Sequence, residues 1–364
     1  TGIGVKEFVS YIGEGWGGKF TGKKLIMYSD YEILSLSRAQ GPAVHTYYDI
    51  AVEEPDGERI LYFEFESDEI PGPGHVIVAD VDGSSAEVVG QAERTIGHVG
   101  ARACWLAPGQ VGWAPNPTKE NRAVILALET GETQTLPAMI RSVNYGARCA
   151  TLIGGGGDGE VTALADVQTV RLLDIDSGEV TTLVTVQKAH ALHPRRDEFS
   201  PAAASFQHPK LSPCGNELFV VFGTTWTQMR SDRKDVPRIK DLFRVNTDGS
   251  NLRYVGSFGD HPMWSPDGRF IFANFKNDRG SKDVLAYPDG EQGEPQPLVR
   301  DVNGGHPSLS PDGRWLLTED LPLSPDHDVS LKLCDLQTQE RRVLISARHA
   351  DGHHITGTHL HPQW

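Results

Sequence analysis

Short apolar runs separated by tight turns recur along most of this chain. Six of these runs are each followed by a turn built on Asp-Gly, Thr-Gly, Ser-Gly or, in the last copy, Asp-Leu-Gln. The runs cover residues 76–80, 124–128, 172–175, 242–245, 285–287 and 331–333. Short apolar runs joined by such turns are typical of β-hairpins. The sequence therefore predicts six hairpins, most of them 41 to 48 residues apart.

A second repeat places a His-Pro pair ahead of a turn and an apolar run. The pairs that begin at His208, His261 and His306 are each followed by Ser-Pro-Cys-Gly or Ser-Pro-Asp-Gly, and a fourth pair begins at His361. Their separations of 53, 45 and 55 residues match the length of a four-stranded propeller blade. We therefore expect an all-β fold, a seven-bladed β-propeller that takes residues 1–364 as a single domain.

The seventh blade is expected to draw on both ends of the chain. Strand-like runs at 7–12, 24–29 and 32–37 precede the first hairpin. Pairing one terminus with the other removes an exposed sheet edge, so we expect these N-terminal strands to close the last blade with the strand of His361. A gap of about 71 residues between the third and fourth hairpins predicts an insertion, which holds residues 188–199 and a basic loop at 230–240.

The charge balance restricts the possible partners. The chain has 34 Lys and Arg against 49 Asp and Glu, a net charge of −15, which opposes non-specific nucleic-acid binding. No apolar run approaches the roughly 18 residues of a membrane span, and the first residues contain no basic-then-apolar leader. The 4 cysteines are scattered and form no CxxC pair, which is typical of a reducing compartment. We expect a cytoplasmic protein that binds neither nucleic acid nor membrane.

The repeated histidines indicate a functional site. In a propeller the innermost strands begin on one face near the central axis, so side chains at that repeat position are expected to point into one funnel. These histidines are His45, His208, His261, His306, His359 and His361. Three converging imidazoles suit a divalent metal ion, and the alternative is a merely polar lining of the channel.

The ordered histidines also resemble those of a known family. The run 261–268, the run 306–313 and the terminal Thr358-His359-Leu360-His361-Pro362, together with Val44-His45-Thr46-Tyr47-Tyr48, are similar to the oligogalacturonate lyases, cytoplasmic seven-bladed propellers that degrade short pectin fragments. The resemblance implies a divalent ion such as manganese, with His306, His359 and His361 as ligands, and it implies His261 as the general base.

This chain departs from the family at two positions. Thr356 stands where the family has a fourth metal ligand, a glutamine, and Asp241 stands where it has a catalytic arginine. Arg238 or Lys240 could replace the missing charge, although a solvated loop is the alternative interpretation of that basic segment. The substrate-binding residues that we expect are His45, Tyr48, His208 and Lys240.

The implied reaction is the cleavage of an acidic oligosaccharide, a 4-linked uronate, by β-elimination. It removes a weakly acidic C5 proton, so it needs a neutral base, for which His261 is the candidate, and a cation on the carboxylate. Arg238 would pair with a second carboxylate. We further expect His261 to have no second histidine beside it. The alternatives are a non-catalytic TolB-like propeller that binds a protein or ligand, and a metal-dependent enzyme that acts on another sugar.

Overall fold

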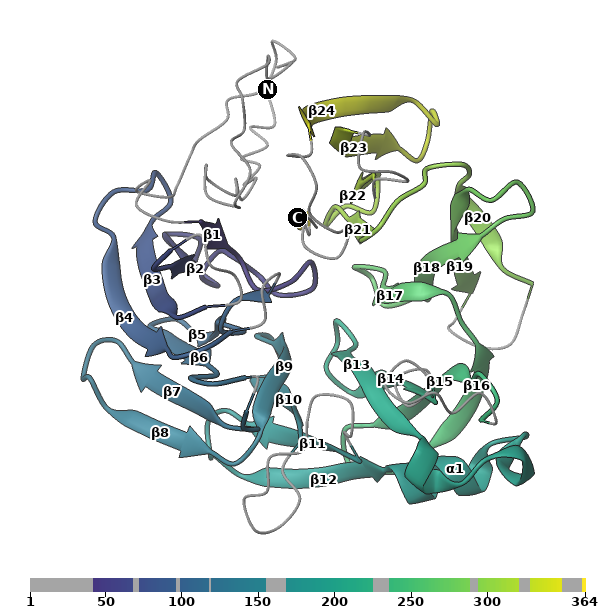
Figure 1. Ribbon diagram of the computed structural model, residues 1–364, viewed down its shortest axis with the longest axis horizontal. Helices are drawn as coiled ribbons and strands as arrows, with labels where there is room; N and C mark the ends of the chain where they lie inside the picture. Colours follow the sequence, from purple (N-terminus) through teal and green to yellow (C-terminus); the bar gives the residue numbers. More distant parts are fainter. Residues whose placement is uncertain are drawn as a thin grey trace. The chain divides into compact units, whose positions relative to one another are not determined.

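The computed structural model describes residues 42–67, 72–95, 99–117, 119–154, 168–224, 236–288, 294–320, 328–348 and 362–364. Within these residues the chain forms six four-stranded sheets, each made of strands that follow one another in the sequence (Figure 1). The sheets are β1 (Ala43–Val44), β2 (Arg59–Phe65), β3 (Gly74–Asp80) and β4 (Glu87–Ala92); β5 (Cys104–Ala107), β6 (Gln110–Trp113), β7 (Ala123–Ala127) and β8 (Thr133–Leu136); β9 (Met139–Asn144), β10 (Cys149–Ile153), β11 (Thr169–Asp174) and β12 (Val180–Thr185); β13 (Ser205–Leu211), β14 (Glu217–Gly223), β15 (Lys240–Asn246) and β16 (Arg253–Ser257); β17 (Asp260–Trp264), β18 (Phe270–Lys276), β19 (Lys282–Pro288) and β20 (Gln296–Val299); and β21 (Ser308–Leu309), β22 (Trp315–Glu319), β23 (Asp328–Asp335) and β24 (Arg341–Arg348).

The all-β propeller class is confirmed, but the prediction of seven blades is wrong, since the described residues form six. Each predicted hairpin is the third and fourth strand of one sheet, so six hairpins complete six blades with their own preceding strand pairs. The fourth His-Pro pair does not start a further strand in the described residues, because 362–364 are irregular. The N-terminal runs that were expected to close a seventh blade, and His361 itself, lie outside the described residues.

The turns of the hairpins owe their shape to paired Asp and Gly residues. Gly83 and Gly249 have φ values of 79° and 80°, in the left-handed region that glycine enters without steric cost. The carboxylates that precede them accept hydrogen bonds from the backbone two residues further on, Asp82 from Ser84 at 2.8 Å and Asp248 from Ser250 at 2.9 Å. This local bonding stabilises the turn before any packing occurs.

The described residues divide into two compact units. Unit 1 consists of the described residues within Thr1–Ala103, Asn274–Leu285 and Pro297–Trp364. Unit 2 consists of the described residues within Cys104–Ala273 and Ala286–Gln296. The core of unit 2 contains the fully buried rings of Phe206, Phe222 and Phe243. Unit 1 has smaller clusters, one under blade one and one under blade six.

The last residues of the chain contact two blades of unit 1. The side-chain oxygen Oε1 of Gln363 accepts a hydrogen bond from the backbone N–H of Val52, at 3.2 Å, just ahead of β2. Trp364 packs against the apolar cluster of blade six, which includes Leu317 and Leu333. The residues in which the sequence suggested a new blade therefore connect blade one to blade six.

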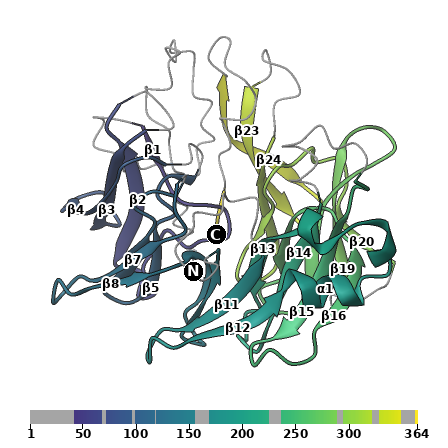
Figure 2. The same cartoon turned by 60° about the horizontal axis from the view of Figure 1, so that its bottom comes forward.

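The predicted insertion between the third and fourth hairpins contains the short helix α1 (Val186–Leu192) and the 3₁₀ turns η2 (Arg196–Glu198) and η3 (Pro201–Ala203). The hydroxyl of Thr185 caps α1 by accepting from the backbone N–H of Lys188 at 3.3 Å. The helix contacts the outer strands β12 and β16, as Figures 1 and 2 show for β16.

Of the basic loop, only residues from Val236 onward are described. None of the helices in the described parts of the chain has the length and apolarity of a membrane span.

Candidate functional site

Two of the repeated histidines stand at distorted points of the inner strands of unit 2. His208 in β13 and His261 in β17 have φ values of 47° and 54°, in the left-handed region. In β13 the register with β14 slips between Gln207 and Lys210, so His208 sits in a β-bulge. Such a conformation costs on the order of 1–3 kcal/mol outside glycine, and it is characteristic of functional sites.

The two imidazoles lie against each other. Their ring centroids are 6.1 Å apart and the ring planes are inclined by 83°, an edge-to-face arrangement between β13 and β17. The expectation that His261 has no second histidine beside it is therefore wrong. The His-Pro repeat places both residues on inner strands, and these strands are in contact in unit 2.

Arg141 is the third member of this group, and no sequence motif marked it. It lies in β9 where the register with β10 slips between Thr151 and Leu152, so it too occupies a bulge. Its side chain is buried, and its Nη2 atom is 3.2 Å from Nδ1 of His208. The available signal was an arginine in the middle of an otherwise buried inner strand, which is rare without a charged or polar partner.

Two lysines add further positive charge around His208. Lys210 is buried, with its Nζ atom 2.9 Å from Sδ of Met263, and Lys240 forms an ion pair with Asp260. Burial lowers the pKa of His208 well below its ordinary value, and the charges of Arg141, Lys210, His261 and Lys240 lower the pKa further. His208 is therefore neutral near pH 7, and its surroundings favour an anion.

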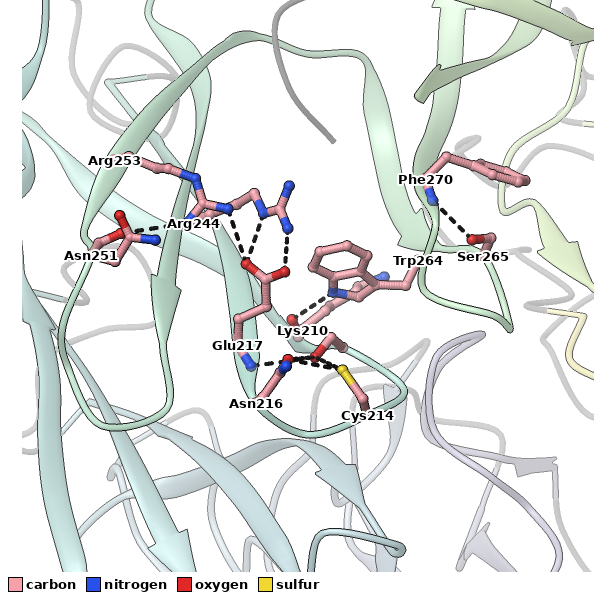
Figure 3. A network of polar contacts seen from close by, with 11 residues as sticks. Lys210, Cys214, Asn216, Glu217, Arg244, Asn251, Arg253, Trp264, Ser265 and Phe270 are labelled. Atoms are coloured by element: carbon pink, nitrogen blue, oxygen red, sulfur yellow. Dashed lines mark hydrogen bonds and ion pairs between the residues drawn. The ribbon is translucent and has the colours of Figure 1, made fainter. Parts of the chain in front are cut away.

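The strands that carry the two histidines are joined by a polar network, which Figure 3 shows. Nε1 of Trp264, in β17, donates to the backbone carbonyl of Lys210, in β13, at 3.1 Å. The guanidinium of Arg244 lies over the Trp264 ring, 5.0 Å from the centroid, and pairs with Glu217, which also binds Arg253 at 3.2 Å. The bond between Trp264 and Lys210 thus links β13 to β17, the two strands that carry the histidines.

Asp241, the position at which the resemblance implies an arginine, has a structural role here. Its Oδ2 atom is 2.8 Å from Nε2 of His193 and accepts from the hydroxyl of Tyr254 at 3.1 Å. The backbone N–H of Arg195 donates to Nδ1 of His193 at 3.0 Å, so the ring proton must lie on Nε2, toward Asp241. Burial lowers the pKa of His193, and Asp241 opposes that shift. The group anchors the insertion to blade four.

The other candidate for the missing charge, Arg238, is exposed and makes no hydrogen bond or ion pair with a described residue. Lys240, two residues further on at the start of β15, belongs to the group around His208. The structure thus brings His208, His261 and Lys240 together and adds Arg141 and Lys210. The prediction of Arg238 as a carboxylate-binding residue stays a prediction.

In unit 1, His306 is held by a carboxylate and two aromatic rings. Its backbone N–H donates to Oε2 of Glu319 at 3.1 Å, and its Nδ1 atom forms a very short contact with Oε1 of the same residue. The rings of Tyr47 and Tyr48 pack on the imidazole with centroid distances of 5.4 and 4.9 Å. Tyr48 is fully buried and His45, which follows β1, is nearly so, and their contact with substrate stays a prediction.

The arrangement of His306 suits a metal ligand. A carboxylate on one ring nitrogen is the usual support that orients a metal-bound histidine through its other nitrogen. The remaining predicted ligands, His359 and His361, and the departure at Thr356 lie outside the described residues. Within the described parts of the chain, no three His, Cys, Asp or Glu side chains form a group that could hold a metal ion.

Comparisons with known proteins support the fold. No protein-family model matches the sequence, and no curated protein is found to be similar to it. Among solved structures, an oligogalacturonate lyase in complex with manganese is 15% identical, with a TM-score of 0.57, and the match covers 84% of this chain and 78% of that one. The oligogalacturonate lyase of Vibrio parahaemolyticus is 14% identical, with a TM-score of 0.57, over 89% and 84% of the two chains. A prolyl endopeptidase is 12% identical, with a TM-score of 0.50, and the match covers 82% of this chain and 43% of that one. At these identities the likeness shows the propeller fold alone.

Proposed function

We propose that this chain is a carbon–oxygen lyase that cleaves an acidic oligosaccharide of 4-linked uronates by β-elimination. The observation that carries the proposal is the gathering of Arg141, Lys210 and Lys240 around the contacting rings of His208 and His261. Cations in a partly buried site neutralise carboxylates. A uronate chain presents one carboxylate on every sugar.

His261 is the proposed base. It would take the C5 proton, which lies beside the carboxylate, while the cationic side chains stabilise the negative charge that develops on that carboxylate. The C4–O bond to the neighbouring sugar would then break as the C4–C5 double bond forms, and the departing oxygen would take up a proton from water. A positioned general base of this kind contributes roughly 10²- to 10⁴-fold to the rate. The fold neighbours include two lyases of uronate oligosaccharides, and this makes the reaction class a natural one for a propeller with such a site.

A divalent ion belongs to the same proposal. His306, supported by Glu319, would be one ligand, and His359 and His361 the others; a bound ion would supply Lewis-acid chemistry. Manganese is the ion in the similar lyase structure. Replacement of His359 by alanine should lower the bound metal well below one per chain in elemental analysis, and unchanged stoichiometry would remove this ligand set.

The test of the function compares His261→Ala with the unchanged protein on uronate oligosaccharides in the presence of Mn²⁺. Elimination creates a conjugated double bond, so turnover should appear as new ultraviolet absorbance, should rise with pH as the imidazole loses its proton, and should vanish in His261→Ala while the bound metal stays. His75→Ala, in β3 of unit 1, is the matched control and should retain activity. Retained turnover in His261→Ala, or a product without the double bond, contradicts the mechanism, and the latter would indicate a hydrolase or an epimerase.

A further inference from the structure

We propose that Arg141 fixes His208 as a neutral imidazole with its proton on Nε2, which makes His208 a hydrogen-bond donor to a substrate carboxylate and leaves proton abstraction to His261. The ligand class in this inference rests on the proposed function. The tautomer of His208 does not depend on it. Arg141 is accordingly a positioning residue, which acts through His208.

The tautomer follows from the donors and acceptors in the contact. A guanidinium has five N–H donors and no acceptor, and it remains charged at every accessible pH. With Nη2 of Arg141 at 3.2 Å, Nδ1 of His208 must offer its lone pair. A proton on Nδ1 would place two N–H groups against each other and would break the bond. The single proton of the neutral ring therefore lies on Nε2.

The surrounding charges keep the ring in this neutral state. The groups that face His208 are Arg141 from β9, Lys210 on its own strand, Lys240 from β15 and His261 from β17, and Asp260 pairs with Lys240. The four cationic groups, His261 in its protonated form, disfavour an imidazolium at His208, and burial acts in the same direction. The ring stays neutral as pH falls through the range in which an ordinary histidine takes up a proton.

The consequence is a division of roles between two histidines that the repeat places alike. Both follow the same His-Pro pattern, both have positive φ, and their rings touch. The lone pair of His208 is committed to Arg141 and its Nε2 carries a proton, so His208 cannot serve as the base. Its Nε2–H, polarised by the guanidinium behind the ring, is a donor suited to a carboxylate. Arg141, His208 and His261 thus form a row across the inner strands β9, β13 and β17.

The first experiment measures the ring directly and needs no catalytic activity. Nitrogen NMR of protein with ¹⁵N-labelled histidine, with the His208 signals assigned by their disappearance in His208→Gln, should show one protonated and one unprotonated nitrogen, unchanged between pH 7.5 and 5.5. In Arg141→Met the same ring should begin to titrate nearer the ordinary range and should populate both tautomers. A His208 ring that titrates normally in the unchanged protein, or that is unaffected in Arg141→Met, overturns the proposal.

The second experiment tests the donor role with a galacturonate trimer. His208→Gln keeps an N–H donor at the ε position, whereas His208→Asn keeps only an acceptor for Arg141. The KM, or the Kd from direct titration with the trimer, should rise roughly tenfold in His208→Asn and less in His208→Gln, with the pH dependence attributed to His261 unchanged. Equal losses in the two variants would remove the donor role of His208, and loss of kcat with a flat pH profile would assign the base to His208. Either result overturns the division of roles. Arg141→Gln, which removes the charge and keeps a polar side chain, replaces Arg141→Met in the NMR experiment if Arg141→Met does not fold.

The two proposals can fail separately. If the NMR result is as expected but no trimer is bound or cleaved, the state of His208 holds and the proposed function is wrong. If the trimer is cleaved while His208 titrates normally, the function holds and the role of Arg141 is wrong.

Discussion

Glu319 is the residue on which the proposed role of His306 as a metal ligand depends. Its carboxylate accepts a hydrogen bond from the backbone N–H of His306 and contacts Nδ1 of the His306 ring. Both side chains are almost completely buried. Glu319→Gln removes the negative charge and with it the support that a metal-bound imidazole needs. We expect the affinity for Mn²⁺, measured by calorimetric titration, to fall by roughly 10- to 100-fold.

A matched control for that substitution exists in unit 2. Glu217→Gln alters a carboxylate that pairs with Arg244 and Arg253, so the Mn²⁺ affinity should stay unchanged. If Glu319→Gln binds Mn²⁺ as tightly as the unchanged protein, His306 is not a metal ligand and its contact with Glu319 only stabilises the fold.

At this same scale the sequence was informative about some residues and silent about others. His208 and His261 were identifiable because a His-Pro pair recurs ahead of each turn, and a repeat is visible without any structure. Their positive φ and the bulge at Arg141 were not, because register slips arise from pairing between strands and leave no mark on either strand alone. Asp241 was judged by a resemblance, and its bond to His193 comes from an insertion whose path the sequence did not determine.

Among the elements, the insertion that contains α1 depends on one acidic side chain of β15. Asp241 accepts from both Nε2 of His193 and the hydroxyl of Tyr254, and His193 is fully buried. Asp241→Leu would leave two donors without an acceptor, which costs about 1–3 kcal/mol for the buried His193 and less for the half-buried Tyr254. We expect a loss of about 2–4 kcal/mol in the free energy of unfolding, measured by urea titration, and faster proteolysis within residues 186–203.

Asp241→Asn is the control for this element. Its side-chain oxygen can still accept from His193 or Tyr254, so the loss of stability should be clearly smaller than in Asp241→Leu. Similar stability of Asp241→Leu and the unchanged protein would mean that the insertion is held by its apolar contacts, such as those of Val186 and Ala189, and not by this bond.

The number of blades illustrates the limit of element counting. The hairpins were predictable because Asp-Gly and Ser-Gly turns are locally encoded, and each recurs as the end of the third strand of a sheet. The fourth His-Pro pair was counted as one more blade, although Gln363 and Trp364 contact blades one and six instead. A strand belongs to a blade only if it pairs with neighbouring strands, and the sequence of the strand alone does not specify these neighbours.

For the whole molecule we predict a loss of stability between pH 7.5 and 5.5. The pKa values of His193 and His208 lie below the ordinary 6.5 in the folded protein, mainly through burial. The unfolded chain therefore takes up protons near pH 6.5 that the folded chain does not, so the free energy of unfolding falls as the pH drops through that window. Urea unfolding at several pH values measures the slope.

Substitution of the two histidines separates their effect on the pH dependence of stability from the effect of the aspartates in the turns. His193→Asn and His208→Asn should each flatten the slope above pH 5.5. Asp248 and Asp312 have pKa values lowered first by hydrogen bonds from Ser250 and Ser310, so their contribution is lost only at lower pH, near the titration of an ordinary carboxylate. Stability that stays constant or rises between pH 7.5 and 5.5 contradicts the prediction.

The contact of Gln363 with Val52 has a consequence for the order of folding. The two residues are separated by 311 positions, and unit 1 collects its strands from both ends of the sequence, whereas most of unit 2 is one continuous stretch. Closing a loop of that length costs roughly 3 kcal/mol more than closing a ten-residue turn, and contacts between distant residues form slowly. During synthesis on the ribosome, blades two to four can fold as they emerge. Blade one, with its apolar strands β2 and β3, cannot yet make its contacts with blade six, because blade six has not been synthesised. The period before the residues around Gln363 join blade one is thus the one in which this protein is most exposed to misassembly.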